Sequence, residues 1–264
     1  GDGSNWDLAF TNIQQAINAS PGEETTLYLK AGFYTNAPAI VVHDHPGLTL
    51  LGGYTGSGLE TGGVTVLTRD PAATNRILFA NSSTLTVERV AFSNGCETLV
   101  GAGLLLSNCT ATLTACDWME NRFTPLHVDQ YGGAIHANAC TLTIRDSRLR
   151  GNGSSAFQNG SKFGGGLYGN ACTLFLSNVS FSLNLLSGWR SAGAGLCLDG
   201  GQAEIRDCSF ATNTASGNGA NGGAIQAARF TSLTLAGCGF GTNVASASTY
   251  PNYGAPSIST AAPP

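Results

Sequence analysis

Apolar and polar residues alternate with a period of two over most of the chain. Bulky apolar side chains occupy every second position of short segments, as Leu142 and Ile144 or Leu174 and Leu176 do. This spacing is typical of β-strands that bury one face. Clusters of Asn, Asp, Ser and Gly separate the segments, which predicts short strands joined by tight corners.

Two motifs repeat at a nearly constant interval, and a repeat of this length decides the architecture. The first is small-small-apolar and ends at residues 104, 135, 167, 196 and 225. The second is a bulky apolar residue followed three positions later by Asn121, Asn152, Asn184, Asn213 or Asn243. In four successive repeats the bulky residue lies 14 positions after the first motif (104 to 118, 135 to 149, 167 to 181, 196 to 210). A segment of fixed length therefore alternates with a loop of variable length.

Short strands of this kind bury their apolar face when each repeat forms one coil that stacks on the previous coil at ~4.8 Å. We predict an all-β parallel solenoid over residues 23–248, regular from about 78, in which the five asparagines form an inward ladder. Trp6, Phe10, Ile13 and Ile17 recur at helical spacing behind Ser4, which we expect to be the N-cap of a capping helix within 1–22. Residues 249–264 form a Pro/Ser/Thr/Ala-rich tail.

Composition excludes several classes of protein. Only 11% of the 264 residues are charged, the net charge is -4, and the only lysines are Lys30 and Lys162. This balance offers no attraction for nucleic acid, and no apolar run has the ~20 residues that span a bilayer. We expect no nucleic-acid partner and no membrane insertion. We interpret the sequence as a mature chain or an excised domain.

Eight cysteines without Cys-x-x-Cys spacing favour an oxidising compartment, so we expect a secreted or cell-surface protein. Five cysteines recur at equivalent positions of nearby coils and are candidate partners in disulfides: Cys109, Cys140, Cys172, Cys208 and Cys238. The alternative is that they are small buried apolar residues. Candidate glycosylation sites are Asn159, Asn108 and Asn178, each in an Asn-x-Ser/Thr triplet.

Candidate chemistry is sparse. His43 and His45 could form a metal pair or a polar approach to a turn. His127, Asp129 and His136 could act as an acid/base group or be solvated loop residues. The basic spot formed by Arg145, Arg148 and Arg150 fits a soluble surface, and the loop aromatics fit either packing or stacking on sugars or another protein. They are Trp189, Tyr131, Phe157, Phe163, Tyr168, Tyr250 and Tyr253. We assign no catalytic residue, metal or cofactor.

The paired Gly-Gly-Ala-Ile and Phe-x-x-Asn motifs resemble the repeats of chlamydial polymorphic outer membrane proteins, which are surface adhesins with a β-helical passenger. The start of the chain, with Gly-Asp-Gly-Ser-x-Trp at 1–6, Lys-Ala-Gly-x-Tyr at 30–34 and Leu-Gly-Gly-Tyr at 51–54, is similar to secreted proteins of the pectin-lyase-like superfamily. Both resemblances imply a right-handed single-stranded parallel β-helix, here of about eight coils. The Gly-His-Gly and Arg-x-Lys strings of polygalacturonases are absent.

These observations predict a non-catalytic structural or adhesive scaffold whose partners are itself or surface glycans and proteins. End-to-end assembly into a filament would use the tail, with Tyr250, Tyr253 and Ile258 as candidate contacts. One alternative is a polysaccharide lyase or glycoside hydrolase that acts along the solenoid. Another is a carbohydrate- or protein-binding surface module.

Overall fold

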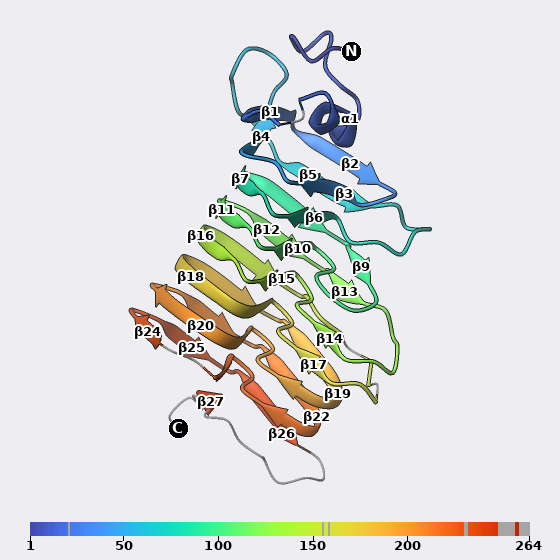
Figure 1. The fold of residues 1–264 in the computed structure, drawn as a ribbon. Coiled ribbons are helices and arrows are strands. Elements are labelled where there is room, and N and C mark those ends of the chain that lie inside the picture. The colour runs from blue at the N-terminus through green and yellow to red at the C-terminus, as the bar shows by residue number, and fades with distance from the viewer. Residues whose placement is uncertain (21, 155, 158, 230–231, 248–256, 259–264) are drawn as a thin grey trace.

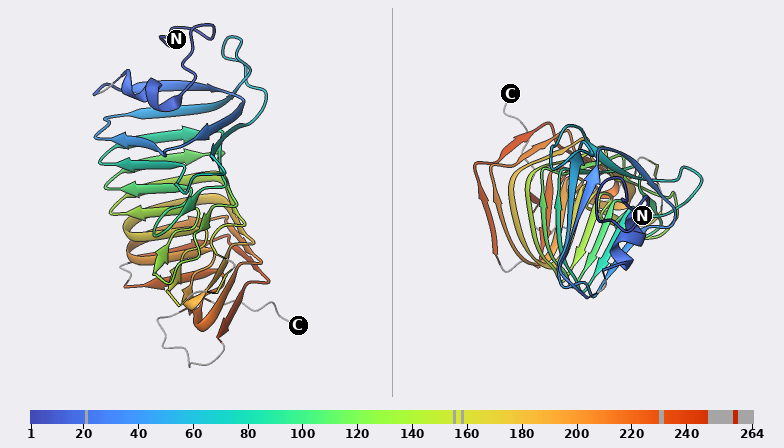
Figure 2. Two further views of the ribbon diagram at one scale, coloured as in Figure 1. Left: turned by 90° about the vertical axis from the view of Figure 1, so that its right-hand side faces the viewer. Right: turned by 90° about the horizontal axis from the view of Figure 1, so that it is seen from above.

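The chain winds into a parallel β-solenoid of about seven turns (Figure 1), which confirms the predicted fold class. The computed structural model describes residues 1–264 except 21, 155, 158, 230–231, 248–256 and 259–264. The expected eight coils are about one too many, because the N-terminal strands β1 (Thr25–Lys30) and β2 (Gly32–Asn36) form only part of a coil. Figure 2 shows the coils stacked on one another, with the helix at one end.

Each regular coil contributes a strand to three successive faces. The first face is built by β3 (Ile40–His43), β6 (Leu78–Asn81), β10 (Leu104–Ser107), β15 (Ile135–Asn138), the start of β18 (Leu167–Ser182), the start of β20 (Leu196–Arg206) and β23 (Ile225–Ala228). The second face is built by β1, β4 (Leu48–Tyr54), β7 (Thr84–Glu88), β11 (Thr110–Thr114), β16 (Thr141–Arg150), later parts of β18 and β20, and β24 (Ser232–Ala236).

The third face consists of β2, β5 (Thr65–Arg69), β8 (Val90–Ser93), β12 (Asp117–Met119), the ends of β16 and β18, β21 (Ser209–Ala211) and β25 (Gly239–Gly241). Separate small sheets lie beyond it. They contain β9 (Cys96–Glu97) with β13 (Arg122–Phe123), and β14 (Gln130–Tyr131), β17 (Lys162–Phe163), β19 (Leu185–Ala192), β22 (Thr214–Asn221) and β26 (Val244–Ala247).

The core is a set of side-chain stacks that run along the solenoid axis. Phe181 lies on Phe210 at 4.7 Å between ring centroids, and Phe92 lies on Trp118 at 5.3 Å with the planes 2° apart. The register places equivalent residues of successive coils directly over one another. The constant interval of 14 residues thus reflects a requirement that identical positions superpose.

Glycine in the first motif is required by the corner that it forms. Gly164 has φ of 63°, and a Cβ atom there would lie 2.4 Å from the carbonyl oxygen of Leu167. An L-residue would meet both the strain of the left-handed region and this steric contact. The small-small-apolar motif therefore marks the corner that leads into the first face.

The N-terminal helix is shorter than predicted. Helix α1 spans Ile13–Asn18, and its N-cap is Asn12, whose side chain accepts a hydrogen bond from the Gln15 N–H group. The prediction that Ser4 is the N-cap is wrong, because the Ser4 N–H and hydroxyl groups donate to Asp2 instead. Apolar spacing alone did not reveal that Asn12 starts the helix closer to the core.

Helix α1 closes the first face at the N-terminal end. Ile13 and Ile17 are buried in the core cluster. The Gln14 side chain accepts a hydrogen bond from the Val41 N–H group at 2.7 Å and donates to the Val41 carbonyl at 3.0 Å. This side chain replaces a neighbouring strand at β3, which limits edge-to-edge association there.

Candidate binding face

The second face presents three columns of outward side chains, because alternate residues of each strand point away from the core. On β7, β11, β16, β18 and β20, the first column contains Thr84, Thr110, Thr141, Thr173 and Gln202. The second contains Thr86, Thr112, Thr143, Phe175 and Glu204, and the third contains Glu88, Thr114, Arg145, Ser177 and Arg206. The face is thus hydroxyl-rich toward the N-terminus and mixed toward the C-terminus.

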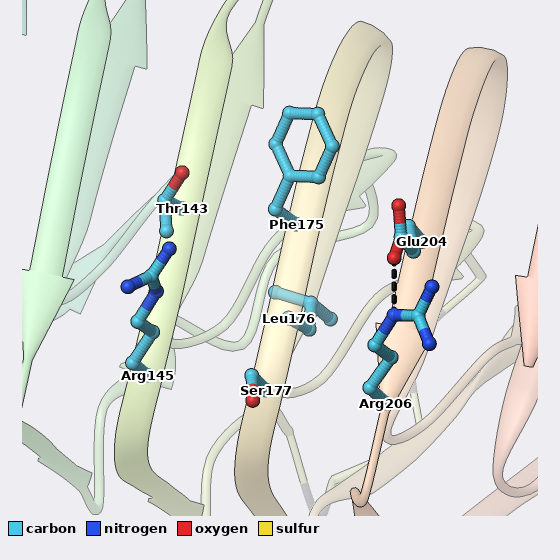
Figure 3. Close-up of a pocket in the computed structure, with 7 residues that line it drawn as sticks. All are labelled: Thr143, Arg145, Phe175, Leu176, Ser177, Glu204 and Arg206. Atoms are coloured by element: carbon cyan, nitrogen blue, oxygen red, sulfur yellow. Dashed lines mark hydrogen bonds and ion pairs between the residues drawn. The ribbon is translucent and has the colours of Figure 1, made fainter. Parts of the chain in front are cut away.

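An open, shallow pocket lies where the character of this face changes (Figure 3). It is lined by Thr143, Arg145, Phe175, Leu176, Ser177, Glu204 and Arg206. The Phe175 ring is 42% exposed, whereas Leu176 beside it points into the core. The register aligns Phe175 with Thr143 on one side and Glu204 on the other. An aromatic ring therefore stands on a polar sheet surface, and Ser177, two residues further along the strand, lies between Arg145 and Arg206.

The two arginines of the pocket differ in their partners. Arg206 forms an ion pair with Glu204 on the same strand. Arg145 is exposed, and no hydrogen bond or ion pair joins its side chain to the described part of the chain. Its guanidinium group can therefore bind an anionic group in the bidentate geometry that carboxylates favour.

The predicted metal pair does not come together. His43 is exposed, and its Nδ1 atom lies 3.8 Å from Asp44 and 3.4 Å from the Asn81 amide. His45 is buried, and its Nδ1 atom accepts a hydrogen bond from the Gly47 N–H group. Among the residues described, no group of three or more His, Cys, Asp or Glu side chains could hold a metal ion.

The candidate acid/base residues are separated as well. His127 and Asp129 accept hydrogen bonds from the backbone N–H groups of Asn159 (3.2 Å) and Ser161 (2.7 Å), so they tie one loop to the next. His136 instead packs against Tyr168 in an aromatic cluster that also includes Tyr131 and Phe163, and burial lowers its pKa to about 4. These three aromatics fit the packing alternative. Trp189 and Phe157 are exposed.

One of the three arginines of the basic spot is neutralised by a carboxylate. Arg148 makes two hydrogen bonds of 2.7 Å to the carboxylate of Asp117 on the neighbouring coil, and all three arginines are exposed. Arg145 belongs to the second face and Arg150 lies at the end of β16 on the third face. The three residues therefore do not act as one cationic surface.

The asparagines form a continuous ladder from Asn121 to Asn243. Asn184 is typical, since its Nδ2 group donates to the Leu149 carbonyl and to Asn213 Oδ1, both at 2.9 Å. Its own Oδ1 atom accepts from the backbone and the side chain of Asn152, both at 3.0 Å. The same pattern links Asn121, Asn152, Asn184, Asn213 and Asn243. The ladder holds the coils together and is not accessible to a ligand.

All eight cysteines are free thiols, so the bridges that column spacing allowed are not formed. Each of Cys109, Cys140 and Cys172 directs its Sγ atom to the carbonyl oxygen two residues earlier, at 3.1 to 3.2 Å. Cys208 and Cys238 make the same contact at 3.2 and 3.4 Å. Parallel Cβ vectors also disfavour a disulfide between stacked residues. All five thiols lie at corners of the coils, where four are buried and Cys238 is half-buried.

Comparison with Ser147 shows what the cysteine side chains contribute at these corners. It occupies the column of Cys116 on the next coil, and its hydroxyl group donates to the Arg145 carbonyl at 2.6 Å. The Cys116 N–H group in turn donates to the Ser147 hydroxyl oxygen. At both positions of this column the side chain therefore acts as a hydrogen-bonding group and not as a disulfide partner.

The other predicted residues lie at the surface or outside the described part. Asn108, Asn159 and Asn178 are exposed, and Asn178 donates to Asp146 at 2.7 Å. Ile258 lies in β27 (Ser257–Ile258), which pairs antiparallel with β23. Tyr250 and Tyr253 lie outside the described residues. The described residues contain no helical segment with the length and hydrophobicity that a bilayer span requires.

Sequence reasoning missed Phe175, which lies in a strand and not in a variable loop. Alignment of the repeats could have revealed this residue, because Phe175 occupies the position that holds Thr86, Thr112 and Thr143 in earlier coils. Comparisons of the chain with models of protein families, with curated proteins and with solved structures give no match. The fold is therefore assigned as a solenoid from the geometry of this chain alone, and the two family resemblances stay predictions.

Proposed function

We propose that the protein is a secreted or cell-surface, non-catalytic scaffold that binds an anionic polysaccharide across its second face. The observation that carries this proposal is the exposed ring of Phe175 among the side chains of Arg145, Ser177 and Thr143 on an open sheet surface. Extended polymers suit such a surface, since it repeats along the solenoid and has no wall that would stop a chain.

The chemistry of the pocket fits a sugar acid. An aromatic ring with an exposed face packs against the C–H groups of a pyranose, and hydroxyl side chains exchange hydrogen bonds with sugar hydroxyls. Arg145 supplies a cation without a partner among the described residues, which suits a carboxylate or sulfate. Arg145 and Arg206 lie two coils apart, or ~9.6 Å for two steps of ~4.8 Å. This separation is close to one disaccharide of an extended chain.

The pocket favours binding over hydrolysis. Glycoside hydrolases generally use two carboxyl groups that flank the scissile bond. Glu204 is the one carboxylate that lines the pocket, and it is paired with Arg206. End-to-end assembly stays a separate prediction, which the closure of β3 by Gln14 does not favour.

Binding is tested by affinity electrophoresis and calorimetry with polygalacturonate, alginate and neutral dextran. Phe175→Ala removes the stacking surface, worth ~0.5–1.5 kcal/mol, and should weaken binding about fivefold. Arg145→Ala removes a charge-assisted contact of ~1.5–3 kcal/mol and should weaken binding more than tenfold, with a smaller salt dependence. The matched controls are Phe33→Ala, whose ring is 80% exposed on the third face, and Arg150→Ala.

The proposal holds if the acidic polymers bind, dextran does not, and only the two pocket variants lose affinity. It is refuted if no acidic polymer binds, or if the control variants lose as much affinity as the pocket variants. New reducing ends or unsaturated products during incubation would identify an enzyme in place of a binding scaffold.

A further inference from the structure

Threonine is concentrated on one face of the solenoid to a degree that strand propensity does not explain. On four successive coils the second face holds Thr84, Thr110, Thr141 and Thr173 in one column, and Thr86, Thr112 and Thr143 in the next. The first face of these coils holds no threonine at its outward positions, which are Phe79, Asn81, Leu105, Ser107, His136, Asn138, Tyr168 and Asn170. The third face there holds Asp117, Met119, Arg148, Arg150, Ser180 and Ser182. A general preference of strands for threonine would act on all three faces alike.

The threonines form a regular two-dimensional array. Their pairing runs without a shift of register from β7 to β18, so equivalent residues repeat at ~4.8 Å from coil to coil. Residues two apart along a strand, such as Thr110 and Thr112, are separated by ~6.6 Å. In Figure 1 the strands β7, β11, β16 and β18 lie side by side and nearly parallel. The column of Thr86 also continues to Thr49 and Thr26 on the earlier coils.

The hydroxyl groups of this array, except that of Thr173, form no hydrogen bond with the described part of the chain. Gln202 donates to the hydroxyl of Thr173, whereas those of Thr86, Thr112 and Thr143 bond to no group in the described chain. Each open hydroxyl group must therefore exchange hydrogen bonds with water. A β-branched side chain is stiff at χ1, so its hydroxyl and methyl groups are held in few orientations. Water bound to the array is consequently placed with the period of the array.

We infer that the threonine array, defined by residues 84, 86, 110, 112, 141, 143 and 173, binds the surface of ice. The ~4.8 Å step between coils is close to the shorter repeat of the prism planes of hexagonal ice, and the methyl groups separate rows of hydroxyls that can join the lattice. The area is small, since four coils span ~14 Å. We therefore expect inhibition of ice recrystallisation and weak shaping of crystals, not a large depression of the freezing point.

The inference is tested with the full chain, labelled with a fluorophore, on growing ice and in a recrystallisation assay. The wild-type protein should coat ice and slow the growth of grains at micromolar concentration. Thr112→Lys places a charged chain at the centre of the array and should raise the required concentration at least tenfold. Thr234→Lys is the matched control, because Thr234 occupies the same column beyond Phe175 and Glu204.

The outcomes separate this inference from the proposed function. Arg145→Ala should leave the effect on ice unchanged while it weakens binding of polygalacturonate. The inference is overturned if ice excludes the labelled wild-type protein, or if Thr112→Lys and Thr234→Lys behave alike. It is also overturned if Thr112→Lys weakens polysaccharide binding while the wild-type protein has no effect on ice. Circular dichroism of both lysine variants checks that their outward substitutions leave the fold intact.

Discussion

Replacing Asn184 by Ala tests what the asparagine ladder contributes to the solenoid. The side chain is fully buried and makes four hydrogen bonds to two neighbouring coils. Its removal leaves the Asn152 N–H group and one Asn152 amide hydrogen without partners, and it takes one hydrogen bond from the Leu149 carbonyl, which also lies in the ladder between β16 and β18. Asn213 Oδ1 keeps its bond from the Asn184 backbone at 3.2 Å.

The expected cost is about 4 kcal/mol, because each buried group left without a partner costs ~1–3 kcal/mol. This is a large part of the ~5–15 kcal/mol that typically stabilises a folded domain. Asn243→Ala is the matched control at the last described rung, where the side chain is only half-buried and water can replace the lost bonds. There we expect a cost of about 1–2 kcal/mol.

Urea unfolding, followed by circular dichroism and tryptophan fluorescence, measures both variants. A break in the middle of a quasi-one-dimensional array should also reduce cooperativity, which lowers the dependence of the unfolding free energy on urea. The reasoning is refuted if Asn184→Ala costs less than about 1 kcal/mol by this extrapolation, or if the two variants are equally destabilised.

Three further predictions concern buried polar groups. Lys162 is buried with its Nζ group on Gln130 Oε1 (2.5 Å) and two backbone carbonyls, and burial lowers its pKa from 10.5 to about 8. Between pH 8 and 10.5 the unfolded chain therefore binds more protons than the folded chain. The difference in the free energy of unfolding between the wild-type protein and Lys162→Met, measured in urea titrations, should increase as the pH rises over that range. The lowered pKa of His136, about 4 against 6.5, means that stability should fall as pH decreases from 6.5 to 4, and NMR should show its imidazole neutral at pH 5.5, between these values. Burial raises the pKa of Cys116 to about 12, so a thiol reagent should spare Cys116 in the native protein and label eight thiols in urea.

The repeating part of the fold could be predicted from sequence because stacking imposes one residue type on each column. The constant interval of 14 residues and the recurrent asparagine specify a coil whose equivalent positions superpose. The start of the helix could not be predicted in this way, since several polar residues near the N-terminus can cap it. Asn12 is selected by where Ile13 and Ile17 meet the core.

The binding face was harder to predict for a physical reason. Outward positions carry no packing requirement, so their pattern becomes visible only after coils are aligned in three dimensions. Thr143 and Phe175 are 32 residues apart in sequence but form a registered pair on adjacent strands. Arg145 and Arg206 likewise become neighbours of one pocket only through stacking.

Because the register between the regular coils is unshifted, outward positions repeat at a fixed interval along the solenoid axis. Each coil contacts only the coils before and after it, so duplication of one complete coil would lengthen every outward column by one position and leave the others in place. The length of such a surface changes by one coil at a time, and the number of coils determines how much of a polymer or a crystal surface it contacts. Selection could thus adjust the size of the ligand that the protein covers by adding or removing repeats, without redesigning any single contact.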